Sequence, residues 1–545
     1  MSKMNKKKIS FNIIAIICII IFGITLAPKT LQNDTFYTIK IGEYINQNGI
    51  DMQDPFSWHE NMSYTYPHWL YDYATYGLYQ LGGMVAIYIA TVVLNCILGI
   101  SMYYTNVKIT KNKLTSFLLT LGSMWMIRGF VAARAQLVTF ILFVFALYFI
   151  ECFIDSKKKR YGVGLVLISL FIANLHVAVW PFFFILFLPY IAEGIIIWIR
   201  DKHFIHKLVT DLKKDKIRRL SKKVGNEEKI KQVEIELIEY EEKFERYKKK
   251  QEEANKNPYR IILEKKEGVK YLVIIMIIAA LMGLLTPIKD TPYTYLVKTM
   301  QGNTTQSINE HLPTVLIQDK ELLCIIALVL AILIFTDTKI RLRDLFMMAG
   351  LLVLTLMSKR QVSLFVILGV TIVNKLICSI FEKYDPQGCK KFEEYIVKPI
   401  GAIITIVITC LVGWVFIKNK IEAPYIDDKS YAIQATQYIK ENLDLENIKL
   451  FNEYNYGSYL LFEGIPVFID SRADLYTPEF NEKDIFSDFL NIASLSTDYE
   501  EKFSEYGITH IINGKKTKLV MILAKDKNYK QIYSDDNFVI YERLK

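Results

Sequence analysis

The sequence lacks the short motifs that mark nucleotide-driven or zinc-protease chemistry. It contains no GxxxxGK[ST] phosphate loop, no GxGxxG after an expected strand and no HExxH pair. Its seven cysteines form no CxxC pair; six lie in apolar segments and one lies in a basic loop without histidine partners. These absences give no support to an ATP-driven enzyme, a nicotinamide-dependent enzyme, a disulfide framework or a structural zinc site.

Polar sequence is scarce outside a few segments. The 545 residues are 52% hydrophobic, with a mean hydropathy of +0.22. Many apolar runs approach twenty residues, the length that a helix rising about 1.5 Å per residue needs to cross a bilayer. The net charge of +10 is concentrated in residues 200–268, which hold 21 Lys or Arg against 15 Asp or Glu. The composition therefore predicts a polytopic α-helical membrane protein, and we expect no nucleic-acid partner.

About eleven membrane-spanning helices are expected from the apolar runs. They are residues 9–27, 84–104, 114–128, 135–154, 162–176, 178–199, 269–287, 321–336, 343–358, 361–380 and 397–418.

The distribution of basic residues predicts how these spans are oriented. The stretch MSKMNKKK precedes the first span and favours a cytoplasmic N-terminus. Alternating the spans from there places the basic loops on the cytoplasmic side and the C-terminus outside. High Lys, Ile and Asn content with a cysteine-free C-terminal segment is typical of a bacterial plasma membrane protein.

This topology divides the chain into four parts. They are an N-terminal membrane module 1–199 with a long first outer loop 28–83, a cytoplasmic charged helical hairpin 200–268, a second membrane module 269–418, and a small extracytoplasmic α/β domain 419–545.

The charged insertion carries an apolar seam at heptad spacing. Its members are Ile230, Val233, Leu237, Tyr240, Phe244 and Tyr247. Such spacing is typical of two packed helices. A solvated arm, a contact with lipid headgroups and a partner-binding surface all stay open as its role.

The last 125 or so residues read as a small α/β domain. IKLFNEYNYGSYLLFEGIPVFIDSR predicts strand, turn, short helix and strand, and GITHIING predicts another strand. KLVMILAKD predicts a helix, and YKQIYSDDNFVIYERL predicts a hairpin. We interpret Asp470 and Arg472 as a structural ion pair in preference to a catalytic one.

Ionisable residues gather where the spans end on the outer side. The set comprises Asp34, Glu43, Asp54, His59, His68, Asp72, Arg128, Arg134, His176, Glu310, His311 and Arg360. The candidates for chemistry among them are Asp34, Asp54, Asp72, Arg134, His176, Glu310, His311 and Arg360. Several lie within a residue or two of apolar runs, where a buried charge is costly. Snorkelling and ordinary surface polarity are the alternative explanation of this set.

The order of these motifs resembles a known family. DTFYTIKIGEYINQNGIDMQDPFSW followed by YPHWLYDYATYGLY is similar to the first outer loop of bacterial GT-C-fold membrane glycosyltransferases. More narrowly, the chain resembles the group related to protein O-mannosyltransferases and lipid-A-modifying polyprenyl-phosphate sugar transferases. RAQLVTF, NLH, INEHLP, KRQVSLF and the NYGSYLLF to VFIDSRADLY block also fit. One departure is Ala135, which replaces the proline usual in the arginine motif.

The resemblance implies transfer of a sugar from a polyprenyl-phosphate carrier to a glycan, lipid or protein acceptor at the outer membrane face. It implies that Asp34, which opens the first outer loop, is the catalytic acid-base residue. Forked donors on Arg134 and Arg360, with His176, suit the carrier phosphate.

Four further residues are expected to bind a metal or the acceptor: Glu310, His311, Asp54 and Asp72. A divalent cation stays open as a cofactor. Two other functions stay open as well: a flippase or transporter of lipid-linked glycan, and a non-catalytic envelope assembly protein with the same fold.

Overall fold

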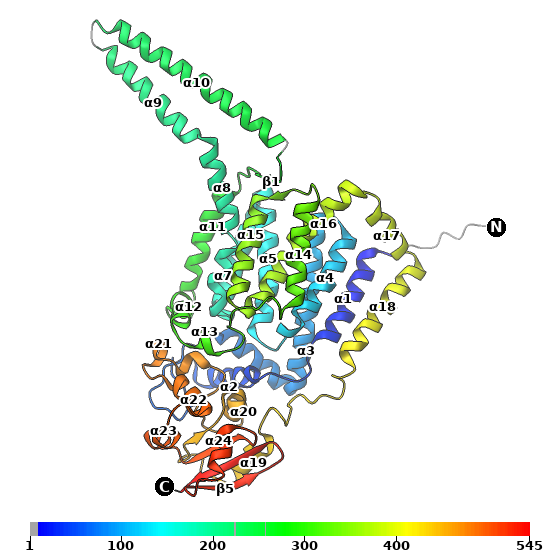
Figure 1. The fold of residues 1–545 in the computed structure, drawn as a ribbon, viewed down its shortest axis with the longest axis vertical. Helices are drawn as coiled ribbons and strands as arrows, with labels where there is room; N and C mark the ends of the chain where they lie inside the picture. Colours follow the sequence, from blue (N-terminus) through cyan, green and yellow to red (C-terminus); the bar gives the residue numbers. More distant parts are fainter. Residues whose placement is uncertain (1–8, 223–224, 257, 545) are drawn as a thin grey trace, which may run out of the picture.

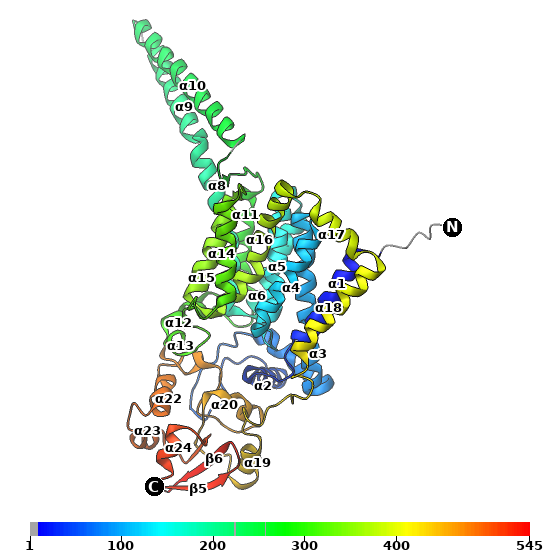
Figure 2. The same cartoon turned by 45° about the vertical axis from the view of Figure 1, so that its right-hand side comes forward.

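The computed structural model describes residues 9–222, 225–256 and 258–544. Figures 1 and 2 show a helical bundle with a long hairpin at one end and a mixed α/β region at the other. We call these the hairpin end and the site end. The basic stretch 1–8, on which the cytoplasmic placement of the N-terminus depends, lies outside the described residues.

Each predicted span overlaps a helix or a short run of helices. These are α1 (Phe11–Leu26), α3 (Trp69–Thr110), α4 (Lys113–Met126), α5 (Ala135–Ser156), α6 (Lys159–Leu175), α7 (Trp180–Ile185) with α8 (Leu188–Asp201), α11 (Val269–Leu281), α14 (Lys320–Phe335), α15 (Leu342–Met357), α16 (Val362–Tyr384) and α18 (Pro399–Ile417). Within the described ranges, five stretches are long and apolar enough to cross a membrane by themselves. The count of eleven spans therefore stays a prediction.

Helix α3 is divided by a glycine pair at the point where the second span was expected to begin. Gly83 has φ 59° and ψ −147°, a conformation open to glycine because it has no Cβ. The kink separates an outer part of α3, which packs on α2 (Asn33–Asn48), from the part within the bundle. The two glycines thus let the chain change direction between a helix at the site end and a helix within the bundle.

The hairpin consists of α9 (His203–Leu220) and α10 (Glu227–Lys256), which pack along the heptad seam. The His206 ring stacks on Phe244 with centroids 3.8 Å apart, and Val233 is 4% exposed. The Tyr247 hydroxyl donates to the Arg200 carbonyl oxygen at 2.8 Å. The proposed boundary after residue 199 falls inside α8, two residues before that helix ends.

Buried ion pairs fasten the hairpin end of the bundle. Arg343 contacts Glu193 at 2.8 Å and Glu264 at 2.6 Å. The Lys375 ammonium lies 3.0 Å from Glu151 and 2.9 Å from Asp344. Opposite charges are brought together here because an isolated buried charge would be very costly. The pairs link α5, α8, α15 and α16, and a two-residue parallel bridge of β1 (Ile261–Ile262) with β2 (Ile340–Arg341) lies beside them.

The α/β region at the site end contains a four-stranded sheet. Its strand order is β3 (Leu450–Phe451), β4 (His510–Gly514), β6 (Phe538–Arg543) and β5 (Tyr529–Ser534), with β3 parallel to β4 and the other pairs antiparallel. The surrounding helices are α19 (Ile433–Asn442), α20 (Tyr454–Phe462), α21 (Pro478–Asn481), α22 (Ile485–Ser494), α23 (Tyr499–Tyr506) and α24 (Lys518–Leu523).

The strand expected at VFID is instead an extended segment with one bridge, between Val467 and Ser57 of the first loop. The Asn452 side chain takes the place of a neighbouring strand, because it accepts from Phe468 N at 2.8 Å and donates to Ile469 O at 2.7 Å. A side-chain amide thus satisfies the backbone groups that a sheet ladder would otherwise pair.

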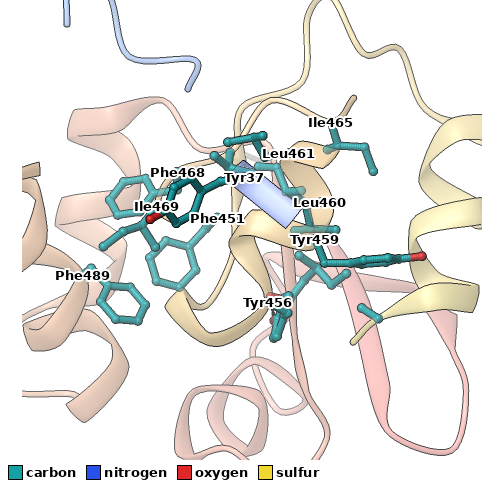
Figure 3. Close-up of a cluster of buried hydrophobic side chains, with 14 of the residues drawn as sticks. Tyr37, Phe451, Tyr456, Tyr459, Leu460, Leu461, Ile465, Phe468, Ile469 and Phe489 are labelled. Carbon is teal, nitrogen blue, oxygen red and sulfur yellow. Dashed lines mark hydrogen bonds between the residues drawn. The ribbon is translucent and has the colours of Figure 1, made fainter. Parts of the chain in front are cut away.

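One apolar core joins this region to α2. Figure 3 shows Tyr37 of α2 among the aromatic and aliphatic side chains of residues 451–489. Phe36, also of α2, is fully buried with its ring centroid 5.2 Å from that of Tyr459. Because α2 shares this core with the α/β region, the N-terminus of α2 is held in a fixed position.

A buried ion-pair cluster fastens the first outer loop to the same region. Arg472 contacts Asp54 at 2.6 Å and Asp470 at 2.7 Å, and all three side chains are at most 3% exposed. The interpretation of Asp470 and Arg472 as an ion pair is confirmed. Burial raises the pKa of Asp54, but Arg472 and hydrogen bonds from Ser57 outweigh it, so that the pKa falls below its usual value.

We expect Asp54→Asn to destabilise the protein by about 3 kcal/mol, because it removes one of two carboxylates from a buried guanidinium. The pKa of Asp54 is lowered on folding, so its contribution is present above the unfolded pKa and is lost as pH falls through the folded pKa. Unfolding of the detergent-solubilised protein between pH 7 and pH 3 measures both effects. Asp536→Asn, at an exposed position in the same region, is the control; an equal loss in both variants would contradict the prediction.

Candidate active site

A cavity of about 1240 Å³ opens between the bundle and the α/β region. Its wall is formed by α2, the loops before α3 and α5, the segment containing α12 (Thr291–Gln301) and α13 (Thr304–Ser307), the α15–α16 turn, and residues 453–493. Six of the eight candidate residues line it: Asp34, Arg134, His176, Glu310, His311 and Arg360. Segments more than 300 residues apart therefore meet in one cavity.

Arg134 is at the centre of the polar part of the cavity wall. Its Nε lies 2.9 Å from Asp34 Oδ2, and its Nη1 lies 3.3 Å from Glu310 Oε1. Burial lowers the pKa of the Arg134 guanidinium, but Asp34 and Glu310 outweigh this and raise it. One permanently charged arginine thus joins two carboxylates from opposite walls.

Local sequence explains how the Asp34–Arg134 pair is held. Asp34 is in the first turn of α2, where the helix dipole favours an anion, and Arg134 is the residue that precedes α5. The neighbouring Thr35 hydroxyl donates to Ala133 O at 3.4 Å. The Asn33 side chain donates to Tyr454 O at 3.0 Å, which ties the same turn to α20.

The loop carrying Glu310 and His311 is bound to the turn carrying Arg360. Arg360 N donates to Glu310 O at 3.0 Å, and Lys359 N donates to Leu312 O at 3.0 Å. Burial raises the pKa of Glu310, but the positive charges of Arg134 and, to a lesser extent, Arg360 outweigh burial and hold that pKa below its usual value. Burial and Arg360 lower the pKa of His311. The loop therefore presents an anionic Glu310 and a neutral imidazole at neutral pH.

A pair of histidines, His68 and His176, also lines the cavity. His176 is 1% exposed, and its Nδ1 is 3.3 Å from the Thr139 hydroxyl. The ring of His68 is 5.0 Å from that of His176. Burial, Arg360 and Arg134 lower the pKa of His68 to about 3. His68 belongs to the ionisable residues expected at the outer ends of the spans, but the sequence predicted no role for it; the structure places it beside His176.

Asp54 and Asp72 do not line the cavity. Asp54 is held by Arg472, as described above, and also accepts from the Ser57 hydroxyl at 2.6 Å. Asp72 is fully buried near Thr38, and within the described residues it forms no ion pair. Their expected roles as metal or acceptor ligands therefore have no geometric support. Sequence position placed both in the outer loop region, but packing turned them away from the cavity.

A cation-binding cluster was another expectation for Glu310 and His311. Across the residues that the structure describes, no group of three or more His, Cys, Asp or Glu side chains is arranged to hold a metal ion. The cationic partner of both Asp34 and Glu310 here is the Arg134 guanidinium.

Asp474 is a further cavity residue that sequence reasoning did not single out. Its carboxylate accepts from the Tyr295 hydroxyl at 2.7 Å, and from the Thr299 and Thr304 hydroxyls at 3.1 Å each. These bonds join α12 and α13 to the α/β region and close one side of the cavity. Only the fold brings Asp474 to the three hydroxyls, because each of them lies 170 or more positions from it in the sequence.

Comparisons with known proteins agree on the fold. No family model matches the chain, and no curated protein matches its sequence significantly. The oligosaccharyltransferase of Archaeoglobus fulgidus in the apo form superposes with a TM-score of 0.54 at 10% identity, covering 92% of this chain and 69% of that one. ArnT from Cupriavidus metallidurans bound to undecaprenyl phosphate superposes with a TM-score of 0.50 at 9% identity, covering 97% of each.

These likenesses show that the chain has the GT-C fold, and its long apolar helices are those of a membrane protein. At this level of identity they show the fold alone. The relation to protein O-mannosyltransferases stays a prediction.

We expect Asp34→Asn and Arg134→Gln to be coupled by about 1 kcal/mol in a double-mutant cycle, because each side chain is only about a quarter exposed. Losing Arg134 leaves two carboxylates without their cation, so removing Asp34 afterwards costs less. The free energy of unfolding in bicelles measures the four variants. The control is a parallel cycle that combines Glu43→Gln with Arg134→Gln, because Glu43 lies on the same helix as Asp34 but is paired with Lys40. Equal coupling energies in both cycles would contradict a specific interaction between Asp34 and Arg134.

Proposed function

We propose that this protein is an integral membrane glycosyltransferase of the outer face of a bacterial plasma membrane. It moves a sugar from a polyprenyl-phosphate carrier to an acceptor. The observation that carries the proposal is the convergence of Asp34, Arg134 and Arg360 on one cavity at the end of a GT-C bundle. ArnT, similar in fold along its whole length, was solved with undecaprenyl phosphate bound.

An apolar groove beside the cavity supports a lipid-linked donor. The groove has a volume of about 290 Å³ and is lined by α5, α7, α8, α15 and α16. Phe182 and Leu354 line both the groove and the cavity. An isoprenoid chain in the groove would leave its phosphate in the polar cavity, since apolar surface favours the chain and the arginines favour the anion.

The residues then have complementary roles in the proposed reaction. Asp34 takes the proton from the acceptor hydroxyl as that oxygen attacks the anomeric carbon, with inversion. Arg134 and Arg360 stabilise the phosphate as the bond to the sugar breaks, because charge accumulates on its oxygens. His176 provides a further hydrogen bond to that phosphate.

The position of the charges favours transfer over transport. A transporter would place its charged residues near the bilayer midplane between broken helices. Here the charged residues of the cavity come from α2 and from loops and turns at the site end of the bundle, where Figure 1 places α2, α12 and α13. An assembly role without catalysis would tolerate replacement of Asp34 and Arg360, and the experiments below separate it from catalysis.

We expect Asp34→Asn to lower kcat for sugar transfer by a factor of about 10² to 10⁴, because the base is removed while its shape is kept. Membrane insertion and thermal stability serve as checks that the variant folds. Transfer from radiolabelled polyprenyl-phosphate sugars to membrane acceptors measures the activity. Glu43→Gln, on α2 but away from the cavity, should retain full activity. A fully active Asp34→Asn enzyme would exclude the proposed base.

We expect Arg360→Gln to weaken binding of undecaprenyl phosphate by about 10- to 100-fold, which corresponds to one lost charge-assisted contact. Native mass spectrometry of the solubilised protein with the lipid measures the Kd. Lys359→Gln is the matched control, since the adjacent Lys359 binds Asn309 and does not line the cavity. If both variants bind like the wild type, Arg360 has no role in phosphate binding.

A further inference from the structure

Helix α9 exposes an apolar stripe on its outer side. Phe204, Ile205, Leu208 and Leu212 are 58%, 55%, 49% and 61% exposed. At 3.6 residues per turn they share one face, opposite the face that carries His206, Thr210 and Ile217 toward α10. Such a cluster on a hairpin surrounded by water would be unfavourable.

The stripe continues an exposed apolar surface at the end of α8. Trp198 and Ile199, at the end of α8, are 58% and 59% exposed, and the ring centroid of Trp198 lies 5.9 Å from that of Phe204. Lys202 adopts a left-handed conformation with φ 48° between the two helices. In Figure 1 the hairpin leans away from the bundle with α9 along its lower edge, the side nearer the bundle end. The outer face of α9, opposite α10, is therefore on the side of the inclined hairpin that is turned back toward the bundle end.

Basic residues flank the stripe on both sides. Lys207, Lys214 and Arg218 lie along one flank and Lys216 along the other, and all four are exposed. Helix α9 holds six Lys or Arg against two Asp, whereas α10 holds eight Lys or Arg against ten Glu. Positive charge thus belongs to the helix that carries the stripe, a pattern typical of helices bound to anionic membrane surfaces.

The extent of the stripe argues against a second helix as its occupant. A coiled-coil partner would require apolar residues along the whole helix. On this face, however, Leu212 is followed by Asp215 and Arg219, both exposed. The exposed apolar residues of α9 are thus limited to its turns nearest the bundle. We expect this pattern for a helix that enters the interfacial layer of a membrane at an angle.

We propose that the outer face of α9 docks on anionic lipids of the leaflet at the hairpin end. Phe204, Ile205, Leu208 and Leu212 enter the boundary between headgroups and acyl chains, and the flanking lysines contact the phosphates. The hairpin would then lie inclined against the membrane, with α9 bound to the lipids. This inference does not depend on the reaction proposed for the cavity.

Photo-cross-linking identifies what covers the stripe. The full chain carries p-benzoylphenylalanine at Leu208, at Leu212 or at the control position Glu242, and is placed in nanodiscs of phosphatidylglycerol and phosphatidylcholine. Glu242 is exposed on α10 and lies between Tyr240 and Phe244, level with His206. We expect lipid adducts at the two stripe positions to exceed those at Glu242 by about five-fold or more. Adducts should decrease in nanodiscs of phosphatidylcholine alone, because the attraction of the lysines is lost.

Other results would overturn the inference. Cross-linked dimers from the stripe positions would assign the face to a second copy of the chain, and equal adduct yields at all three positions would remove its specificity. A further variant carries Lys207→Glu and Lys214→Glu, exposed changes that leave the seam with α10 intact. With the probe at Leu208 it should lose the preference for phosphatidylglycerol, and a retained preference would contradict a role for the basic flanks.

Discussion

The site end of the molecule depends on the need to keep Arg134 paired. A guanidinium cannot lose its charge in a protein, and near a bundle of apolar helices it requires anionic partners. Asp34 and Glu310 supply them from two directions. Because these three residues come from distant parts of the chain, their ion pairs hold α2, the start of α5 and the loop at residue 310 around a single cavity. The same charge that stabilises this arrangement is suited to a phosphate ligand.

The opposite end of the bundle is stabilised in the same way. Arg343 and Lys375 are paired with acids from α5, α8 and α15. Each of the helices α5, α15 and α16 therefore has residues of the buried ion-pair network near its hairpin end. At its other end, each helix is next to a residue that lines the cavity. A scaffold held at both ends restricts the relative motion of Arg134, Ser358 and Arg360, which are contributed by the ends of these helices. Precise placement of forked donors is what phosphate recognition requires.

Part of this architecture could be predicted from single residues and their spacing. The apolar runs predicted helices at the observed places because the thickness of a bilayer fixes the length of a span. The heptad seam from Ile230 to Tyr247 identified the helix that packs on α9, since helical periodicity is local. Asp34, Arg134 and Arg360 were found because charges beside apolar runs are unusual. The strand at VFID was not formed, because a distant side chain, Asn452, satisfies its backbone.

By itself, the sequence determined which apolar runs are helical and which charges border the bundle, since these follow from local composition and period. The phosphate chemistry came from the family resemblance and from the chemistry of arginine. Tertiary structure decided which of these residues meet. Asp54 and Asp72 have the same local character as Asp34, yet packing buries both away from the cavity, with Asp54 beside Arg472. Asp474 joins the cavity wall although no local pattern marked it, and His68, an outer ionisable residue without a predicted role, joins it beside His176. The physical reason is that ion pairs and shared cores act between residues hundreds of positions apart, and neither spacing nor hydropathy encodes such distances.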